Sequence, residues 1–185
     1  MLNLYQVLKN HDNYELESNT NNQKKKKILI APTWGTNFFD LNIHLSVKKN
    51  ISLEKYDLFI RPHIMSTLKN KNLISDLVKK DFQISDGKIN LNHFDLLITD
   101  WSGIYIEFAK IKKTKSILIQ NKEKILNDKY YEFKNDTIDT YARNKLGIIL
   151  TLNELSLIGD KVEDIFRNQH KFVSEIDNFF KNNFY

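Results

Sequence analysis

The chain of 185 residues contains no cysteine, only two prolines and only five glycines. The absence of cysteine excludes disulfide frameworks, thiolate nucleophiles and zinc sites built from cysteine. The longest apolar runs are far too short to cross a bilayer. The first residues lack the charged head and the uninterrupted apolar segment of a secretory signal. We therefore expect a cytoplasmic protein.

Arginine is also scarce, and Arg61, Arg143 and Arg167 are the only three. Lysine therefore dominates the net charge of +5. A lysine-rich surface attracts phosphorylated substrates or anionic lipid headgroups, but it is also an ordinary solvated coat. A peripheral contact with the inner face of the plasma membrane stays open as an alternative. A nucleic-acid-binding module would interleave aromatic and basic residues, and because the chain does not, no specific nucleic acid is expected.

The order of polar and apolar segments predicts three parts within a chain of single-domain size. Residues 1–26 are polar and predict a leader or linker. Residues 27–152 alternate apolar runs with segments of helical spacing and predict a Rossmann-like α/β domain. Residues 153–185 carry apolar residues three and four positions apart, which predicts a helical tail.

The apolar runs predict a parallel sheet. We expect strands at 28–32, 57–63, 82–85, 94–100, 116–120 and 147–152, helices at 37–49 and 102–112, one or two helices within 64–80, and a turn at 86–87. Continuous apolar runs, rather than alternation, are typical of strands buried on both faces. The fold class is therefore α/β with a doubly wound parallel sheet, whose ligands bind beyond the carboxyl ends of the strands.

The first motif at such an end is APTWGTN, residues 31–37. Gly35 permits an unusual backbone conformation, and Thr36 or Asn37 can cap the next helix. Trp34 can stack on a base or line a cleft. The alternative is an ordinary loop between a strand and a helix.

The second motif is RPHIMS, with Arg61 and His63 at the end of the next strand. An arginine can bind two phosphate oxygens at once, and a histidine can donate a hydrogen bond or exchange a proton. These residues therefore form a candidate anion-binding pair. The alternative is an ion pair for Arg61 and a helix cap for His63.

The third motif is ITDWSG, in which Ser102 and Gly103 open a helix. Unsatisfied N–H groups and the helix dipole attract anions to such a helix start. Gly103 lacks the Cβ that would obstruct a diphosphate, and the Ser102 hydroxyl can add a hydrogen bond. Glu107 can accept a hydrogen bond from a ribose hydroxyl. The alternative is a plain helix cap.

Together the three motifs resemble a known family. APTWG, RPH and DLLITDWSGIYIEFA are similar, in order and spacing, to the C-terminal half of the CDP-glycerol glycerophosphotransferases, which include teichoic-acid polymerases and primases. The resemblance spans roughly residues 27–125. It implies one half of a GT-B fold, the half that binds the donor nucleotide. The implied enzyme is a glycerophosphotransferase or glycosyltransferase in the synthesis of surface polysaccharides or teichoic-acid-type polymers.

The resemblance also implies roles for residues at the donor site. Ser102 and Gly103 would hold the donor pyrophosphate, Thr99 and Asp100 would shape the turn, and Thr33 would line the cleft.

It further implies that His63, with Arg61, contacts the phosphate or stabilises the departing nucleoside phosphate, and that Glu107 binds the ribose. No metal or other cofactor is expected, because protein donors can neutralise a leaving phosphate. The donor itself, such as CDP-glycerol, is a substrate.

Two of the departures from the family pattern bear on the donor site. Gly35 stands where the family often has arginine, and Gly103 replaces a second serine. A nucleotide sugar therefore remains an alternative donor. Arg143 is a candidate to reach the same cleft, whereas Asp40 and His44 fall in the first predicted helix and are expected to be solvated.

The N-terminal half of a GT-B enzyme would bind the acceptor, and we expect it as a further domain or a partner chain. An inactive nucleotide-binding or interaction domain is the alternative. A response-regulator-like signalling domain shares the topology, but it requires an acidic cluster after the first strand, where this chain has Ala-Pro-Thr-Trp.

Overall fold

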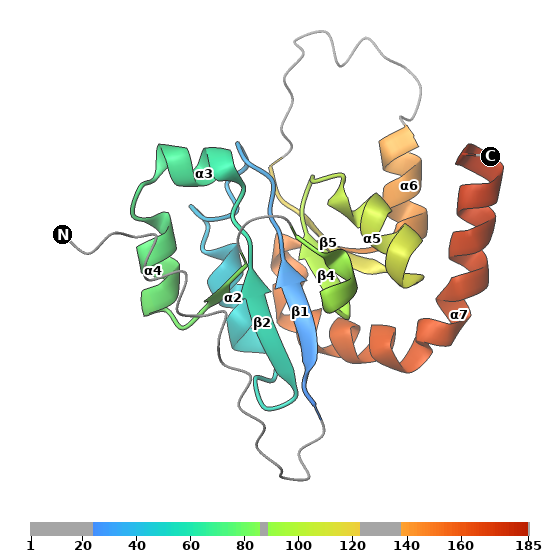
Figure 1. Ribbon diagram of the computed structural model, residues 1–185, viewed down its shortest axis with the longest axis horizontal. Helices are drawn as coiled ribbons and strands as arrows, with labels where there is room; N and C mark the ends of the chain where they lie inside the picture. The colour runs from blue at the N-terminus through green and yellow to red at the C-terminus, as the bar shows by residue number, and fades with distance from the viewer. Residues whose placement is uncertain (1–23, 86–88, 123–137, 185) are drawn as a thin grey trace, which may run out of the picture.

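The computed structural model describes residues 24–85, 89–122 and 138–184. Six parallel strands form one sheet in the order β3-β2-β1-β4-β5-β6 (Figure 1). The strands are β1 Lys26–Ile30, β2 Tyr56–Ile60, β3 Gln83–Ile84, β4 Leu96–Thr99, β5 Ser116–Gln120 and β6 Gly147–Thr151. The strand order runs outward in both directions from the β1–β4 pair, as in doubly wound folds. The predicted fold class is confirmed.

Helices cover both faces of the sheet. They are α2 Ile43–Asn50, α3 Ile64–Lys69, α4 Leu73–Lys79, α5 Ile104–Lys112, α6 Ile138–Leu146 and α7 Ile158–Phe184, with short 3₁₀ helices η1 Leu91–His93 and η3 Leu152–Leu157. The core on one face includes α2, α4 and the first part of α7. The core on the other face includes α5, α6 and the last part of α7.

Successive residues of β1 enter different cores. Ile28 and Ile30 pack in the first core and Leu29 packs in the second, and all three are fully buried. Because both faces are covered, a polar residue on either face of β1 would lose its water. This explains why the buried residues 28–30 of the strand form a continuous apolar run.

The long helix α7 lies along the amino ends of the strands, which we call the amino edge of the sheet. Its Ile165 packs in the first core and its Ile176 in the second. Between them, α7 passes beneath the amino ends of the strands (Figure 1), where Lys26 Nζ lies 3.9 Å from the centroid of the Phe166 ring. The predicted helical segment at the C-terminal end is thus present, and it packs on both faces of the sheet.

The first helix begins later than predicted. It was expected from residue 37, but α2 begins at Ile43, after Asn42 with a left-handed φ of 53°. In the turn that precedes α2, Phe38 is fully buried in the first core. Thr36 and Asn37 therefore do not cap this helix. Within 64–80, where one or two helices were predicted, the structure has two, α3 and α4.

His44 is buried, so its expected exposure was wrong. Its ring lies 5.3 Å from that of Phe39 and 5.7 Å from that of Phe82, centroid to centroid. Burial, with a smaller contribution from the charge of Lys80, lowers the pKa of His44 from 6.5 to about 4. The side chain is therefore neutral near pH 7. Asp40, by contrast, is exposed as expected. The predicted turn at 86–87 and residues 1–23 of the predicted leader lie outside the described residues.

Candidate functional site at the carboxyl edge of the sheet

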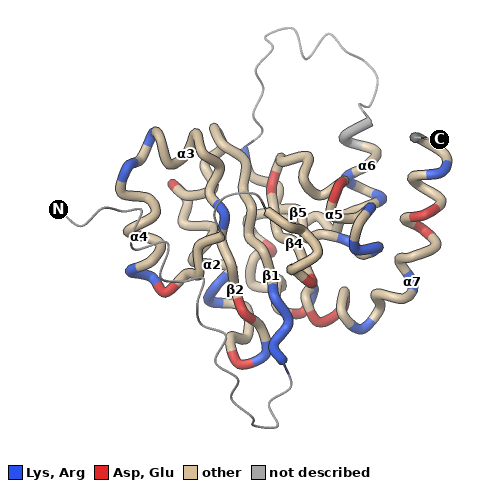
Figure 2. Tube along the Cα trace, viewed as in Figure 1, with Lys and Arg blue, Asp and Glu red and all other residues tan. Residues whose placement is uncertain are grey.

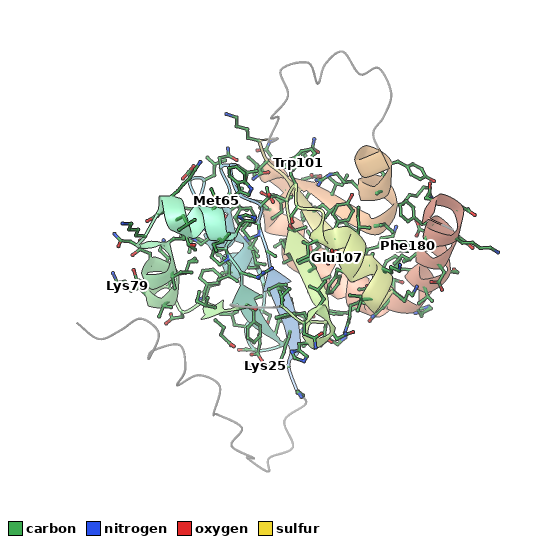
Figure 3. The ribbon with its side chains drawn as sticks, turned by 45° about the horizontal axis from the view of Figure 1, so that its top comes forward. Lys25, Met65, Lys79, Trp101, Glu107 and Phe180 are labelled. Carbon is green, nitrogen blue, oxygen red and sulfur yellow. The ribbon has the colours of Figure 1, made fainter. Side chains whose placement is uncertain are left out.

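The three sequence motifs lie at one edge of the sheet. They follow β1, β2 and β4, and these strands are neighbours in the order β2-β1-β4. All three strands are parallel, so their carboxyl ends share that edge. Met65 and Trp101, which follow β2 and β4, accordingly lie toward the same end of the molecule in Figure 3. After β1 the chain leads to α2 on one face, and after β4 it leads to α5 on the other.

The carboxylate of Asp100 joins three segments at this edge. Its Oδ1 accepts a hydrogen bond from the backbone N–H of Thr33 at 2.8 Å. Its Oδ2 accepts from the Thr36 hydroxyl at 2.8 Å and from Asn121 Nδ2 at 3.2 Å. Asp100 is fully buried. The loop after β1, the turn after β4 and the end of β5 are therefore held by one side chain.

Thr99 makes a second connection between β4 and the loop after β1. Its buried hydroxyl donates to the carbonyl oxygen of Ala31 at 2.6 Å, and Ala31 N–H donates to the carbonyl oxygen of Ile98 at 2.9 Å. The side-chain oxygens of Thr99 and Asp100 are thus bound within the protein. Both residues can shape the turn without contacting a ligand.

Arg143 reaches this edge from α6. Its Nη1 donates to the carbonyl oxygen of Asp100 at 2.6 Å, and its guanidinium lies 4.1 Å from the centroid of the Trp101 ring. Trp101 Nε1 donates to the carbonyl oxygen of Asn121 at 3.2 Å. Arg143 is buried, so it supports the turn from the protein interior. Arg143 was a predicted candidate, whereas Asn121 was not predicted from the sequence; its signal was a polar residue directly after a predicted strand.

The turn itself presents an open helix start. Ser102 is half-buried, and Gly103 is exposed and is the N-cap residue of α5. Gly103 has a φ of −65°, which any residue can adopt. A Cβ built on Gly103 would meet no described atom within 4 Å. The fold therefore does not require glycine there. In the first turn of α5, the N–H of Ile106 donates to the carbonyl oxygen of Gly103 at 3.0 Å, and the N–H groups before it lack an intrahelical acceptor, as at every helix start.

His63 caps α3, which was the alternative to a role in anion binding. Its Nδ1 accepts a hydrogen bond from Met65 N–H at 3.1 Å. In the neutral ring the hydrogen is therefore on Nε2, which is a donor. The His63 ring centroid lies 6.1 Å from that of Trp34, and Lys69 Nζ lies 5.6 Å from the Trp34 ring. Arg61 is half-buried, and its backbone N–H donates to the carbonyl oxygen of Ile30 at 2.8 Å.

The structure also shows the positions of the predicted residues Glu107 and Gly35. Glu107 is exposed in the first turn of α5, and Figure 3 shows it on that helix. Gly35 has a left-handed φ of 79°. An arginine at that position would be strained, which gives a physical reason for this departure from the family pattern.

Residues 24–85, 89–122 and 138–184 lack two further features. No three His, Asp or Glu residues there are grouped in a way that could hold a metal ion. No helix in these ranges has both the length and the apolar character needed to span a membrane.

Comparison with known proteins adds a family and a fold. The sequence profile of the family described as CDP-Glycerol:Poly(glycerophosphate) glycerophosphotransferase matches residues 4–182. The chain is 31% identical over 103 residues to the teichoic acid poly(glycerol phosphate) polymerase of Bacillus spizizenii, covering 50% of this chain and 26% of that protein.

A solved structure of the wall teichoic acid polymerase TagF aligns with a TM-score of 0.53 and 20% identity. The alignment covers 86% of this chain and 38% of the polymerase, and at that identity it shows a shared fold alone. The chain thus spans well under half the length of either relative.

Proposed function

Because the chain belongs to the CDP-glycerol:poly(glycerophosphate) glycerophosphotransferase family, we propose that the carboxyl edge of its sheet binds a nucleotide-activated donor. The chain is then the donor-nucleotide half of a transferase in the synthesis of teichoic-acid-type or other surface polymers. The observation that carries the proposal is the open helix start at Gly103, where a Cβ would meet no described atom within 4 Å.

In this proposal the donor pyrophosphate lies against the start of α5. The first N–H groups of the helix and the Ser102 hydroxyl donate hydrogen bonds to it, and the helix dipole favours its negative charge. Gly103 allows the phosphate oxygens to approach the backbone. Glu107, exposed in the first turn of α5, accepts a hydrogen bond from the ribose. Thr33 lines the site from the loop after β1.

The reaction proposed for the complete enzyme is a phosphoryl transfer. With CDP-glycerol as the donor, an acceptor hydroxyl oxygen forms a bond to the phosphorus that carries glycerol, the bond from that phosphorus to the bridging oxygen breaks, and CMP leaves. Arg61 and the Nε2–H of His63 stabilise the negative charge that develops on CMP. The acceptor proton passes to a base that we assign to the acceptor-binding half.

Isothermal titration tests donor binding. CDP-glycerol, CMP, UDP-sugars and GDP-sugars are titrated into the wild type, Ser102→Ala and His63→Ala. Ser174→Ala and His170→Ala are matched controls, since both residues are exposed on α7. We expect saturable binding of one nucleotide class, weakened about tenfold by each site change and unaffected by the controls. Equal affinity in all five proteins would contradict the proposed site.

The partner we propose is an acceptor-binding half, on the same polypeptide or on another. This chain covers 38% of the polymerase structure that it resembles, and the remainder could supply that half. An inactive nucleotide-binding domain is the alternative function. Mixing the chain with a candidate partner and measuring CMP release separates the two, because only a transferase half restores turnover.

A second proposed contact is with an anionic membrane surface, through α3. No residue of α3 is buried, and Ile64 and Leu68 are 68% and 64% exposed on one face of the helix. Residues 61–80 contain five Lys or Arg and one Asp. Figure 2 shows basic residues on both α3 and α4. Exposed apolar side chains flanked by lysines suit an anionic bilayer.

Sedimentation with vesicles tests this contact. We expect the wild type to bind vesicles of 30% anionic lipid, and the double variant Ile64→Gln, Leu68→Gln to bind roughly tenfold more weakly. Ile111→Gln with Val173→Gln is the control, because these exposed apolar residues lie on α5 and α7. If both double variants bind as the wild type does, α3 is not the contact.

A further inference from the structure

We propose that Thr36 is a positioning residue for the donor site, because its hydroxyl holds the loop after β1 against the turn that carries Ser102 and Gly103. The inference rests on the proposed function and deepens it. Thr36 does not cap a helix, and its hydroxyl instead donates to Asp100 Oδ2 at 2.8 Å. It would act through Asp100 rather than by contact with the donor.

The loop is held to Asp100 at both of its ends. Thr33 binds Oδ1 through its N–H, and Thr36 binds Oδ2 through its hydroxyl, each at 2.8 Å. The chain between them bends at Gly35, whose φ is 79°. Trp34 lies in this short loop, whose two ends are bound to one carboxylate. The position of its ring, 6.1 Å from that of His63, depends on both bonds.

Asp100 is held in place by bonds other than the one from Thr36. It should therefore stay in position when the Thr36 bond is removed. The residue is fully buried, Asn121 Nδ2 donates to its Oδ2, and Arg143 Nη1 donates to its carbonyl oxygen. Hydrogen bonds to a buried carboxylate are stronger than those between neutral groups. Loss of the Thr36 bond should therefore release the loop while the turn stays in place.

Thr36 is a favourable residue to change. It is half-buried, so replacing its hydroxyl with a methyl group leaves no large cavity. Thr36→Val keeps the shape and removes the donor, whereas Thr36→Ser keeps the donor. Thr151→Val is a matched control, because the Thr151 hydroxyl also bonds to a carboxylate, that of Glu154 at 2.7 Å. Thr151 is the last residue of β6, the outermost strand next to β5.

The two tryptophans report on the two segments that Asp100 joins. Trp34 and Trp101 are the only ones in the chain, so 5-fluorotryptophan labelling gives one ¹⁹F resonance from the loop and one from the turn. A Trp101→Phe sample assigns them. We expect Thr36→Val to shift the Trp34 resonance, and Thr36→Ser and Thr151→Val to leave it in place. This measurement needs no ligand.

Donor affinity gives the functional result. We expect Thr36→Val to raise the dissociation constant for CDP-glycerol about tenfold, and Thr36→Ser and Thr151→Val to stay within about twofold of the wild type. The inference is overturned if Thr36→Val binds as the wild type does, if Thr36→Ser is as weak as Thr36→Val, or if the Trp34 resonance does not move. A wild type that binds no nucleotide donor overturns the proposed function, while the ¹⁹F result still decides whether Thr36 holds the loop.

Discussion

The two edges of the sheet are held together in different ways. At the amino edge, lysines at the strand starts pair with acidic residues of α7: Lys55 with Glu163 at 2.8 Å and Lys115 with Glu175 at 3.0 Å. The Tyr56 and Phe166 rings stack there, 5.4 Å apart. At the carboxyl edge, hydrogen bonds join one loop to another through Asp100. The contacts at the amino edge attach a long helix to the sheet, whereas those at the carboxyl edge position loops.

This difference suggests a division between stability and binding. Contacts of α7 contribute to the stability of the fold because the helix packs in both cores. The carboxyl edge presents Gly103 at its surface with space around it, so changes there should affect a ligand more than the fold. Changes in the core and at the two edges should therefore separate effects on stability from effects on binding.

The pH dependence of stability tests the core between the two edges. Since the pKa of His44 falls from 6.5 to about 4 on folding, the unfolded chain binds more protons between these values. Stability from this residue is complete above pH 6.5 and is lost as the pH falls toward 4, by up to about 3 kcal/mol.

Urea unfolding from pH 4 to pH 8 measures this loss. His44→Leu should flatten the curve over that range, and His170→Gln, at an exposed position of α7, should not. An unchanged pH dependence in His44→Leu would assign the effect to other groups.

Gly159→Ala should weaken the attachment of α7. A Cβ on Gly159 would overlap the carbonyl oxygen of Asn50, at the end of α2. Backbone atoms cannot move aside as a side chain can, so we expect a loss of about 2 kcal/mol in the free energy of unfolding. Donor affinity should not change. A variant as stable as the wild type would show that α2 and α7 can separate without cost.

Glu163→Gln should have a smaller effect. Hydrogen bonds from Lys55 and Tyr56 lower the pKa of Glu163. The pair with Lys55 is partly exposed, with 62% and 38% of the two side chains accessible. We therefore expect a loss of about 0.5 kcal/mol at pH 7, reduced by high salt. Glu54→Gln, at an exposed position near the same edge, is the control, and an equal effect of both changes would contradict a specific pair.

Much of the fold could be predicted from the sequence because strands buried on both faces are continuous apolar runs. The predicted strand 116–120 coincides with β5, since a charged residue before it and a polar residue after it mark its ends. The start of α2 could not be predicted. Asn42 before it is left-handed, and Phe38 packs in a core with residues far along the chain; apolar spacing reveals neither.

The candidate site, too, could be predicted from the sequence only in part. The sequence placed its motifs at strand ends, and the parallel sheet brings those ends together. Which side chains bind the protein and which face the solvent could not be read from spacing. Asp100 bonds to residues 64 and 67 positions earlier and to one 21 positions later, so its role depends on the tertiary fold. The burial of His44 has the same cause, since Phe82 lies far along the chain.

The most direct test compares two glycines. CDP-glycerol is titrated into Gly103→Ala and Gly159→Ala, and the stability of each is measured in urea. We predict that Gly103→Ala changes the free energy of unfolding by less than about 0.5 kcal/mol, because its Cβ meets no described atom. Its donor affinity should fall at least about tenfold, because the methyl group stands where the pyrophosphate approaches. Gly159→Ala should lose stability and keep its affinity. If Gly103→Ala binds the donor as tightly as the wild type, the helix start at Gly103 does not hold the pyrophosphate and the proposed site is wrong.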